Sequence, residues 1–288
     1  MEGINQADLF STIIKFQKTL DTIPDSLSDL LTSYSGIRED DQLNHIIKIR
    51  DGAYDVYPYP CLGGFVFLKF NLSSHPLYQD HVLTPLSQKS PEGTAEPLFL
   101  DLGTCFGQDI RKLVYDGALA SRVWASDIDP EFIELGFKLF NDADKFPKDH
   151  FLCPGNLLSK SSEDRLGVLD DKVTIIHASH VFHLFGLEEQ KTAIDRCLRL
   201  LRKDTGKPVL VVGIQGGCTT PTAALHTWTP KYVHNEKSWQ ELWHEVRESD
   251  TWRDRIKMLD VKSELQKLGV EPGAELAWQI FEVWVTFT

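Results

Sequence analysis

The stretch PLFLDLGTCFGQDIRKLV, residues 97 to 114, predicts the fold of this chain. Residues 98–103 have the pattern of a buried strand, Gly103 predicts a tight turn, and residues 108–119 have the pattern of a helix. In α/β sheets, a strand that turns through glycine into a helix is where a nucleotide-type cofactor site begins. Which cofactor the turn accepts depends on the spacing of its glycines.

The glycine spacing disfavours a dinucleotide and excludes a P-loop. A G-x-G-x-x-G fingerprint that begins at Gly103 requires glycine where this chain has Cys105 and Gln108, and no GK[ST] follows. The spacing Asp101-x-Gly103-x-x-x-Gly107 instead fits a turn for S-adenosylmethionine, which has no pyrophosphate for the backbone to approach. Taken alone, the same spacing is equally consistent with a strand-to-helix turn that binds nothing.

Polar residues at the ends of the next two predicted strands support the cofactor hypothesis. Asp127 ends the second strand, where an acid is expected to accept hydrogen bonds from ribose hydroxyls. Asp129 is a weaker candidate, because it can instead cap the helix that follows. Asn156 ends the third strand, where its amide would meet the adenine edge. We therefore expect S-adenosyl-L-methionine as the cofactor, held by Asp101, Gly103, Thr104, Gly107, Asp127, Ile128, Asn156, Leu157 and Ala178.

The alternation of strand and helix patterns after residue 97 predicts a doubly wound, Rossmann-like α/β fold. Runs rich in Val, Ile and Leu, separated by helical patterns, are typical of a parallel sheet covered by helices on both faces. The chain ends in a strand pattern with no helix after it, which favours an antiparallel edge strand; 260–269 is its expected neighbour, as a strand or a short helix. The predicted strands are 98–103, 121–129, 150–156, 173–179, 207–217 and 275–288, and the predicted helices are 108–119, 130–146 and 188–204.

The N-terminal third has a different pattern, which predicts a mainly helical cap. Apolar residues recur at helical spacing in 7–20, and a second helix is predicted at 41–57. The stretch 57–70 is dense in aromatics, prolines and glycines, and its prolines predict an ordered loop rather than a regular helix. A polar, turn-rich segment, 87–97, marks the boundary. We predict a helical cap or lid at 1–90 and a cofactor-binding core at 91–288.

Composition limits the partners and the compartment. The formal net charge of −12 over 288 residues disfavours a nucleic acid or an anionic membrane surface as a partner, because both repel an acidic protein. Five cysteines without a CxxC pair suit a reducing compartment better than a disulfide framework or a zinc site. We find no secretory signal and no run that could span a membrane, so we expect a cytoplasmic protein.

Several blocks of the sequence resemble a class I S-adenosylmethionine-dependent methyltransferase, and more narrowly a fungal secondary-metabolism family that methylates meroterpenoid intermediates. The resemblance spans nearly the whole chain, and its YPYPC and GQDIRKLV segments are more specific than the glycine turn. The blocks are YPYPCLGGFVFL (57–68), LFLDLGTCFGQDIRKLVYDGA (98–118), SDIDPEFIELGFKLFND (126–142), IIHASHVFHLFGLEEQ (175–190) and VHNEKSWQELWHEV (233–246).

The resemblance implies both a fold and a reaction. The fold is the seven-stranded sheet of class I methyltransferases, and the family's typical reaction is methyl transfer to the carboxylate of a farnesylated dimethylorsellinic-acid-type precursor. This chain departs from the family at Thr104, where cysteine is common, and at Asn156, where aspartate is common. An asparagine still offers an amide oxygen to the adenine amino group.

The run HASHVFH, residues 177 to 183, supplies the candidates for the methyl-transfer region. His180 and His183 are expected there, either as a general base or as donors that orient the acceptor. A carboxylate acceptor is already anionic and needs no base, whereas a phenol or alcohol would use one. His177 can instead face a neighbouring strand, and His183 can simply pack or cap. No carboxylate or cysteine stands nearby to complete a metal shell, so we expect no metal.

The expected acceptor is a small, largely apolar natural product. Tyr57 and Tyr59 of the cap are candidates to cover the site, with cap anchoring as the alternative. His234 and Trp239 are candidates to line the acceptor pocket, against an exposed loop position for the first and a core position for the second. A hydroxyl or nitrogen methyltransferase and a non-catalytic, cofactor-binding regulatory protein remain alternatives. The sequence leaves open whether two copies form a homodimer.

Overall fold

The computed structural model describes residues 15–90, 93, 95–159, 161, 164–223, 231–267 and 276–288. The helix predicted at 7–20 lies mostly outside the described residues, and its described part, 15–20, is not helical. Among the described helices, none combines the length and the apolar character that a membrane crossing requires.

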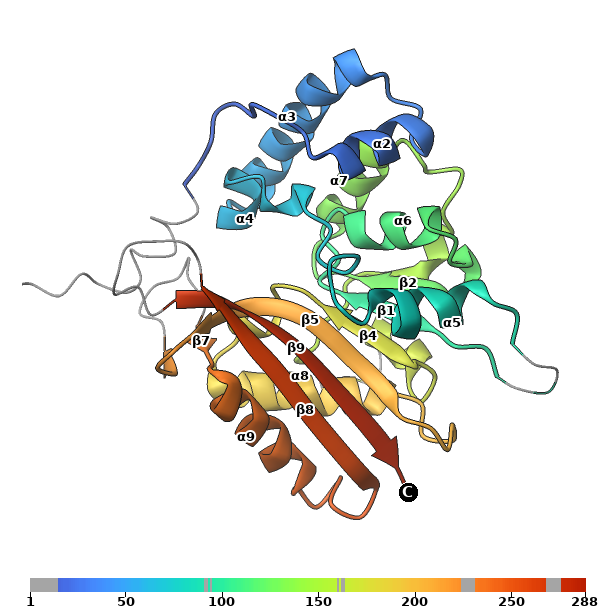
Figure 1. Cartoon of the computed structure of the whole chain (residues 1–288), viewed down its shortest axis with the longest axis vertical. Coiled ribbons are helices and arrows are strands. Elements are labelled where there is room, and N and C mark those ends of the chain that lie inside the picture. The colour runs from blue at the N-terminus through green and yellow to red at the C-terminus, as the bar shows by residue number, and fades with distance from the viewer. Residues whose placement is uncertain are drawn as a thin grey trace, which may run out of the picture.

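A seven-stranded sheet forms the centre of the molecule (Figure 1). Its strand order is β3-β2-β1-β4-β5-β9-β8, with β1 to β5 parallel and β9 antiparallel to both β5 and β8. The order reverses between β1 and β4, which is where ligands bind in open α/β sheets. The strands are β1 (Phe99–Leu102), β2 (Val123–Ser126), β3 (Phe151–Leu152), β4 (Ile175–Ala178), β5 (Val209–Cys218), β8 (Ile256–Lys267) and β9 (Leu276–Phe287).

The predicted doubly wound fold is confirmed, with one correction at the sheet edge. The last strand of the chain, β9, does not lie at the edge as predicted. It inserts between β5 and β8, so the long strand β8 takes the edge. β9 has a long antiparallel ladder on each side: residues 276–285 pair with β5 and residues 277–287 pair with β8. A separate two-stranded ribbon joins β6 (Thr222–Ala223) and β7 (Tyr232–Val233).

Helices cover both faces of the sheet, as the apolar strands require. All four residues of β1 are buried. Apolar side chains of α8 and α9 pack on one face, and those of α6 and α7 pack on the other. The side chain of Asp129 caps α7, accepting a hydrogen bond from Glu131 N at 2.9 Å, as its alternative role predicted. The helices are α6 (Gln108–Tyr115), α7 (Pro130–Phe140), α8 (Leu187–Leu200) and α9 (Glu236–Arg247).

The segment before β1 is mainly helical, as predicted. The helix predicted at 41–57 is present as α3 (Glu39–Val56). The aromatic stretch 57–70 contains two short helical turns in place of the predicted loop, because Pro60 occupies the first turn of α4, where its missing N–H costs nothing. The other elements, which the pattern did not predict, are α2 (Asp25–Ser33), α4 (Pro60–Gly63), η1 (Val66–Leu68), η2 (Tyr78–Leu83) and α5 (Thr84–Ser87). The domain boundary near residue 90 stays a prediction.

The cap shares a hydrophobic core with the start of the cofactor-binding region. Side chains of α2, α3 and α4 pack against Phe106 and Phe132, which belong to the turn after β1 and to α7. Arg50 is 1% exposed; it pairs with Asp51 (Nε–Oδ1 at 2.7 Å) and donates to the carbonyls of Gln17 and Gly63. Its guanidinium also lies over the ring of Phe65, at 4.0 Å from the centroid. The cap therefore has its own buried cation, satisfied by one carboxylate and by backbone oxygens.

A buried ion pair connects α6 to the segment that follows α7. Arg111 and Asp142 are both fully buried and form a bidentate salt bridge, with Nε–Oδ2 at 2.7 Å and Nη2–Oδ1 at 3.0 Å. Arg111 also donates to the carbonyl of Phe106 at 2.7 Å, and Tyr34 of the cap donates to Asp142 at 2.8 Å. This pair thus holds the glycine turn, α7 and the cap in one arrangement.

Candidate active site

A cavity of 470 Å³ lies at the carboxyl ends of β1, β2 and β4 and extends under the cap. Its size falls in the range of about 300–1,000 Å³ that is typical of small-molecule and cofactor sites. The structure brings most of the predicted site residues together around it. They are Tyr57, Tyr59, Asp101, Gly103, Thr104, Asp127, Ile128, Asn156, Leu157, His180 and His183.

The glycine turn has the backbone conformation that its sequence predicted. Gly103 has a φ of +66°, and a Cβ there would lie 2.6 Å from Cγ2 of Val181. Gly107 has a φ of +65°, and a Cβ there would lie 2.5 Å from Nη1 of Arg111. Both positions therefore need glycine. Gly107 does not line the cavity; it serves the start of α6, as its place in the motif predicted, and the packing of Arg111.

Asp127 is held at the cavity by backbone donors. Its Oδ2 accepts from Cys105 N at 2.7 Å and its Oδ1 from Asp129 N at 3.2 Å, which leaves further lone pairs on both oxygens. Burial raises the pKa of this carboxyl to about 6, although the backbone hydrogen bonds oppose the shift. This carboxylate at the end of β2 is buried and still has lone pairs free to accept hydrogen bonds. It therefore suits two neighbouring hydroxyl donors, such as those of a ribose.

Asn156 and Ile128 lie at the rim where an aromatic base would fit. Ile128 is 54% exposed although it is apolar, and Leu157 lines the same part of the cavity. The amide oxygen of Asn156 already accepts from Leu158 N at 2.9 Å, so its NH₂ group is the part with no partner among the described residues. The amide oxygen that was expected to face the ligand is thus engaged by the chain itself.

Below the turn, four side chains form a continuous hydrogen-bonded chain. Oδ1 of Asp101 lies 2.7 Å from Nδ1 of His177, and Nε2 of His177 lies 2.6 Å from Oγ of Ser179. Oδ2 of Asp101 accepts from the hydroxyl of Thr104 at 2.6 Å. His177 therefore faces the neighbouring strand, as its alternative role predicted. Both oxygens of Asp101 are thus engaged within the chain.

His183 is fixed by the backbone of β5. Gly216 N donates to Nδ1 of His183 at 2.9 Å, so Nδ1 carries no proton. The proton of the neutral ring must then sit on Nε2, which has no hydrogen-bond partner among the described residues and belongs to a side chain that lines the cavity. Burial lowers the pKa of His183 to about 3, so the ring is neutral. His183 thus offers the cavity a donor.

His180 is held in a left-handed backbone conformation, with a φ of +59°. Its N–H donates to the carbonyl of Ile214 at 2.7 Å, and its ring packs edge-on against Trp278 and His183. Burial, with a smaller effect of His177, lowers the pKa of His180 to about 4. Strain of this kind in a residue other than glycine is concentrated at functional sites.

Three further predicted site residues lie away from the cavity. Ala178 is fully buried, and its carbonyl lies against Gly213, where a Cβ would approach to 2.0 Å. His234 is 2% exposed and is engaged by Ser238 and Gln190, so it is a core histidine beside α9. Trp239 is fully buried in an aromatic cluster that includes Phe182 and Phe281. The expectation that His234 and Trp239 line the acceptor pocket is corrected by this packing.

The two cap tyrosines line the cavity, and Tyr59 also anchors the cap to the cofactor-binding region. Tyr57 and Tyr59 line the cavity, with ring centroids 4.3 Å apart. The ring of Tyr59 also lies 5.9 Å from that of Phe132 in α7, within the core shared by the cap and the cofactor-binding region. Burial raises the pKa of Tyr59, so its hydroxyl stays protonated.

The sequence reasoning missed several residues of the cavity wall. Trp278 lines it because the antiparallel register of β9 places this residue opposite Gly216. No local pattern could have shown that pairing. Ser179 could have been found from the sequence: it stands two residues after His177 at the end of a strand, and residues two apart in a strand lie on the same face. Other wall residues that were not predicted include Phe67, Phe132, Leu184, Phe185 and Lys231.

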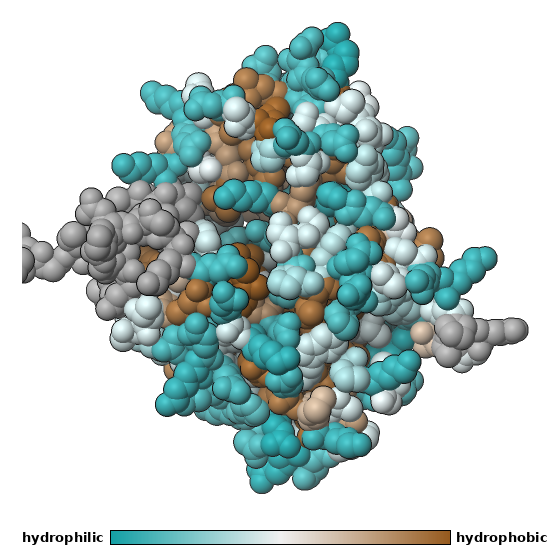
Figure 2. Space-filling view, viewed as in Figure 1, coloured by the Kyte–Doolittle hydropathy of each residue, from teal (hydrophilic) through white to brown (hydrophobic). Residues whose placement is uncertain are grey.

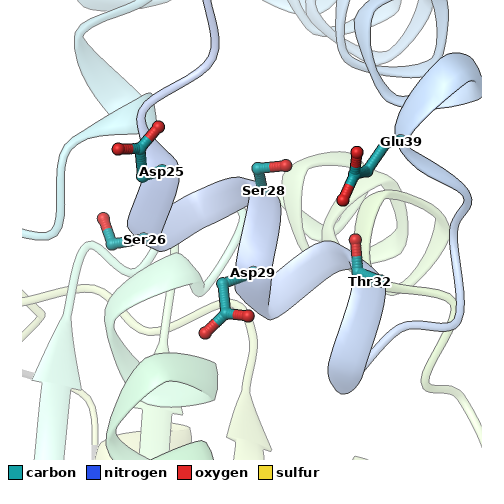
Figure 3. A pocket seen from close by; sticks show the side chains of 6 residues that line it. All are labelled: Asp25, Ser26, Ser28, Asp29, Thr32 and Glu39. Carbon is teal, nitrogen blue, oxygen red and sulfur yellow. The ribbon is translucent and has the colours of Figure 1, made fainter.

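A second hollow, of 580 Å³, lies on the surface between α2 and the start of α3 (Figure 3). Its three carboxylates and three hydroxyls are mostly solvent-exposed, and it contains no residue of the glycine turn or of the HASHVFH run. Figure 2 shows hydrophilic residues around most of the outline of one face, with apolar residues gathered in smaller patches between them. The central cavity is therefore the better candidate for chemistry.

Two family models and several fungal proteins match this chain. Residues 15–68 match the model of the meroterpenoid methyltransferase N-terminal domain, and residues 100–206 match that of a methyltransferase domain. The Asnovolin E/Chermesin D methyltransferase nvfJ of Aspergillus novofumigatus is 32% identical, over 81% of this chain and 79% of the relative. The methyltransferase adrK of Penicillium roqueforti is 31% identical, over 85% and 82%, and the O-methyltransferase phiE of a fungal species is 31% identical, over 86% and 79%. The chain therefore belongs to the fungal meroterpenoid methyltransferases, class I enzymes of secondary metabolism whose cofactor is S-adenosylmethionine.

Proposed function

We propose that this methyltransferase esterifies a carboxylate of a prenylated polyketide intermediate, a small and largely apolar natural product. The observation that carries the proposal is the hydrogen bond from Gly216 N to Nδ1 of His183. It makes the ring a hydrogen-bond donor at the cavity, which suits an anionic acceptor. A neutral hydroxyl acceptor would instead require a base at this place.

The cavity residues fit the cofactor. When bound, S-adenosylmethionine supplies a methyl group on a positively charged sulfur, which the acceptor takes up. Asp127 would accept from the ribose hydroxyls, and Ile128 and Leu157 would pack on the adenine. Gly103 leaves the turn open, because no side chain projects from it. Tyr57 and Tyr59 would exclude water from above.

Neither predicted catalytic histidine is suited to act as a base. The pKa of His183 is lowered to about 3 and that of His180 to about 4, in both cases mainly by burial. A ring with so low a pKa holds a proton too weakly to remove one from a phenol or an alcohol. A carboxylate acceptor is already deprotonated, so no base has to remove a proton from it. His183 and His180 would instead orient it by donating hydrogen bonds.

The cavity wall suits an apolar body attached to that carboxylate. Aromatic and aliphatic side chains of the cap, of α7 and of β9 face it, among them Phe67, Phe132 and Trp278. Such a wall favours a prenylated molecule over a sugar or a nucleotide. The names of two relatives, the O-methyltransferases phiE and atr3, support transfer to oxygen.

The test is product analysis with matched acceptors. The enzyme is incubated with methyl-labelled cofactor and a prenylated aromatic acid, and in parallel with the same compound reduced to its primary alcohol. We expect label in the acid only, and mild base should release it as methanol, as an ester requires. Base-resistant label, or turnover of the alcohol at a similar rate, would contradict esterification and indicate an ether or amine product.

A further inference from the structure

We infer that Ser179 is a positioning residue that donates its hydroxyl hydrogen to the acceptor carboxylate, and that the buried pair of His177 and Asp101 turns this hydroxyl toward the cavity. The inference rests on the proposed esterification. It adds a residue outside the predicted set, and it assigns a use to a buried histidine that the proposed function leaves idle.

With Asp101 as a carboxylate, the contacts allow two arrangements of the protons. Nε2 of His177 and Oγ of Ser179 are 2.6 Å apart, so a single hydrogen lies between them. If His177 is neutral, with its proton on Nδ1 toward Asp101, the serine hydroxyl must donate to Nε2 and can only accept from the cavity. If His177 carries both protons, Nε2 donates to Oγ, and the hydroxyl hydrogen is free to point into the cavity.

The charges around His177 favour the second arrangement. Burial by itself lowers the pKa of His177, but the carboxylate of Asp101 on β1, at 2.7 Å, outweighs it, and the pKa ends above its ordinary value. Asp109 on α6 acts in the same direction. Two histidines also face it, His75 from the segment before η2 and His180 from its own loop, and the pKa of each is lowered, mainly by burial, so both are neutral.

Ser179 and His183 then form one donor edge. Both follow β4, four residues apart, and both line the cavity. A hydroxyl hydrogen from Ser179 and Nε2–H from His183 suit the oxygens of a carboxylate, since hydrogen bonds to a charged partner are the strong ones. A base relay would need the opposite state, with His177 unprotonated and Ser179 as acceptor. The two roles therefore have opposite dependence on pH.

The test is the pH profile of wild type, Ser179→Ala and Ser179→Thr, at saturating cofactor with the free acid as acceptor. We expect wild-type kcat/KM for the acceptor to fall as pH rises through the pKa of His177. In Ser179→Ala it should be lower by about 10- to 100-fold in the plateau at lower pH, as expected for a hydrogen bond to a charged group, and the fall with pH should disappear. Ser179→Thr keeps a hydroxyl and should retain both the rate and the profile.

The other outcomes overturn the inference in distinguishable ways. A wild-type rate that rises with pH, with the rise lost in Ser179→Ala, would make the chain a base relay. An equal loss of affinity for S-adenosylhomocysteine, with the acceptor KM unchanged, would assign Ser179 to the cofactor. An ester product with the same pH profile in Ser179→Ala would refute the inference while leaving the proposed function intact. A product that resists mild base would refute the proposed function itself. Circular dichroism of each variant checks that it folds.

Discussion

Gly216 N donates a hydrogen bond to Nδ1 of His183 across 2.9 Å, from strand β5 to the turn that follows β4. A backbone N–H cannot give up its proton, so the contact fixes the ring as an acceptor at Nδ1 and a donor at Nε2. Burial keeps the ring neutral, with its pKa lowered to about 3. One peptide group on a neighbouring strand thus determines what this histidine can offer to a substrate.

The first prediction separates a donor from a base at position 183. His183→Leu should lower kcat/KM for the acceptor by about 10- to 100-fold, because a hydrogen bond to a charged group is lost. His183→Gln should recover a large part of it, since its amide nitrogen can take the place of Nε2 but cannot accept a proton. Steady-state kinetics with the free acid measures both. Equal inactivity of the two variants would favour a base and contradict the donor role.

The second prediction concerns the pH dependence of cofactor binding. Burial raises the pKa of Asp127 to about 6, so the carboxylate gains a proton as pH falls through about 6 and loses acceptor capacity. We expect the Kd of S-adenosylhomocysteine, measured by calorimetry, to rise below that pH in wild type. Asp127→Asn should bind more weakly at pH 7.5 and lack this dependence. Asp129→Asn, which alters only a helix cap, is the control and should keep it. A wild-type Kd that is flat from pH 5 to 8 would contradict this role.

The third prediction tests why residue 103 is glycine. Gly103→Ala should cost about 1–2 kcal/mol of unfolding free energy from its left-handed backbone alone, and more from the overlap with Val181. Val181→Ala removes that overlap, so the double variant should be more stable than the sum of the two single changes predicts. Urea unfolding of the four proteins gives the coupling. Strict additivity would show that the contact of 2.6 Å relaxes without cost.

The fourth prediction concerns the buried pair of Arg111 and Asp142, which joins α6 to the segment after α7. Asp142→Leu leaves the fully buried guanidinium of Arg111 without its carboxylate, which should destabilise the fold by about 3–5 kcal/mol. The double variant Arg111→Met with Asp142→Leu should recover much of this loss, because no unpaired charge remains. The control, Asp41→Asn, breaks the exposed pair with Arg38 and should change the midpoint of urea unfolding very little. Equal losses in the single and double variants would contradict the charge argument.

The sequence by itself determined the fold class, the cofactor turn and the acid of the second strand. These features are local: β1, Gly103 and Asp127 lie within about thirty residues, and strand and helix periods show in short windows. The family resemblance extended the prediction to the cap and to the methyl acceptor. The short helical turns of the cap could not be predicted from the sequence, because Pro60 and its glycine-rich neighbours suit a loop as well as a single helical turn.

Only the tertiary structure decided which histidines line the cavity and which groups their ring nitrogens contact. His234 and His183 look alike in sequence, yet Gln190 and Ser238 enclose the first in the core, while Gly216 presents the second to the cavity. The insertion of β9 beside β5 likewise brings Trp278 to the site from the end of the chain. Such contacts depend on strand order and register, which join residues far apart in sequence. The sequence therefore fixes which side chain stands at a position. Its protonation state and its hydrogen-bond partners depend on the residues that the fold places next to it.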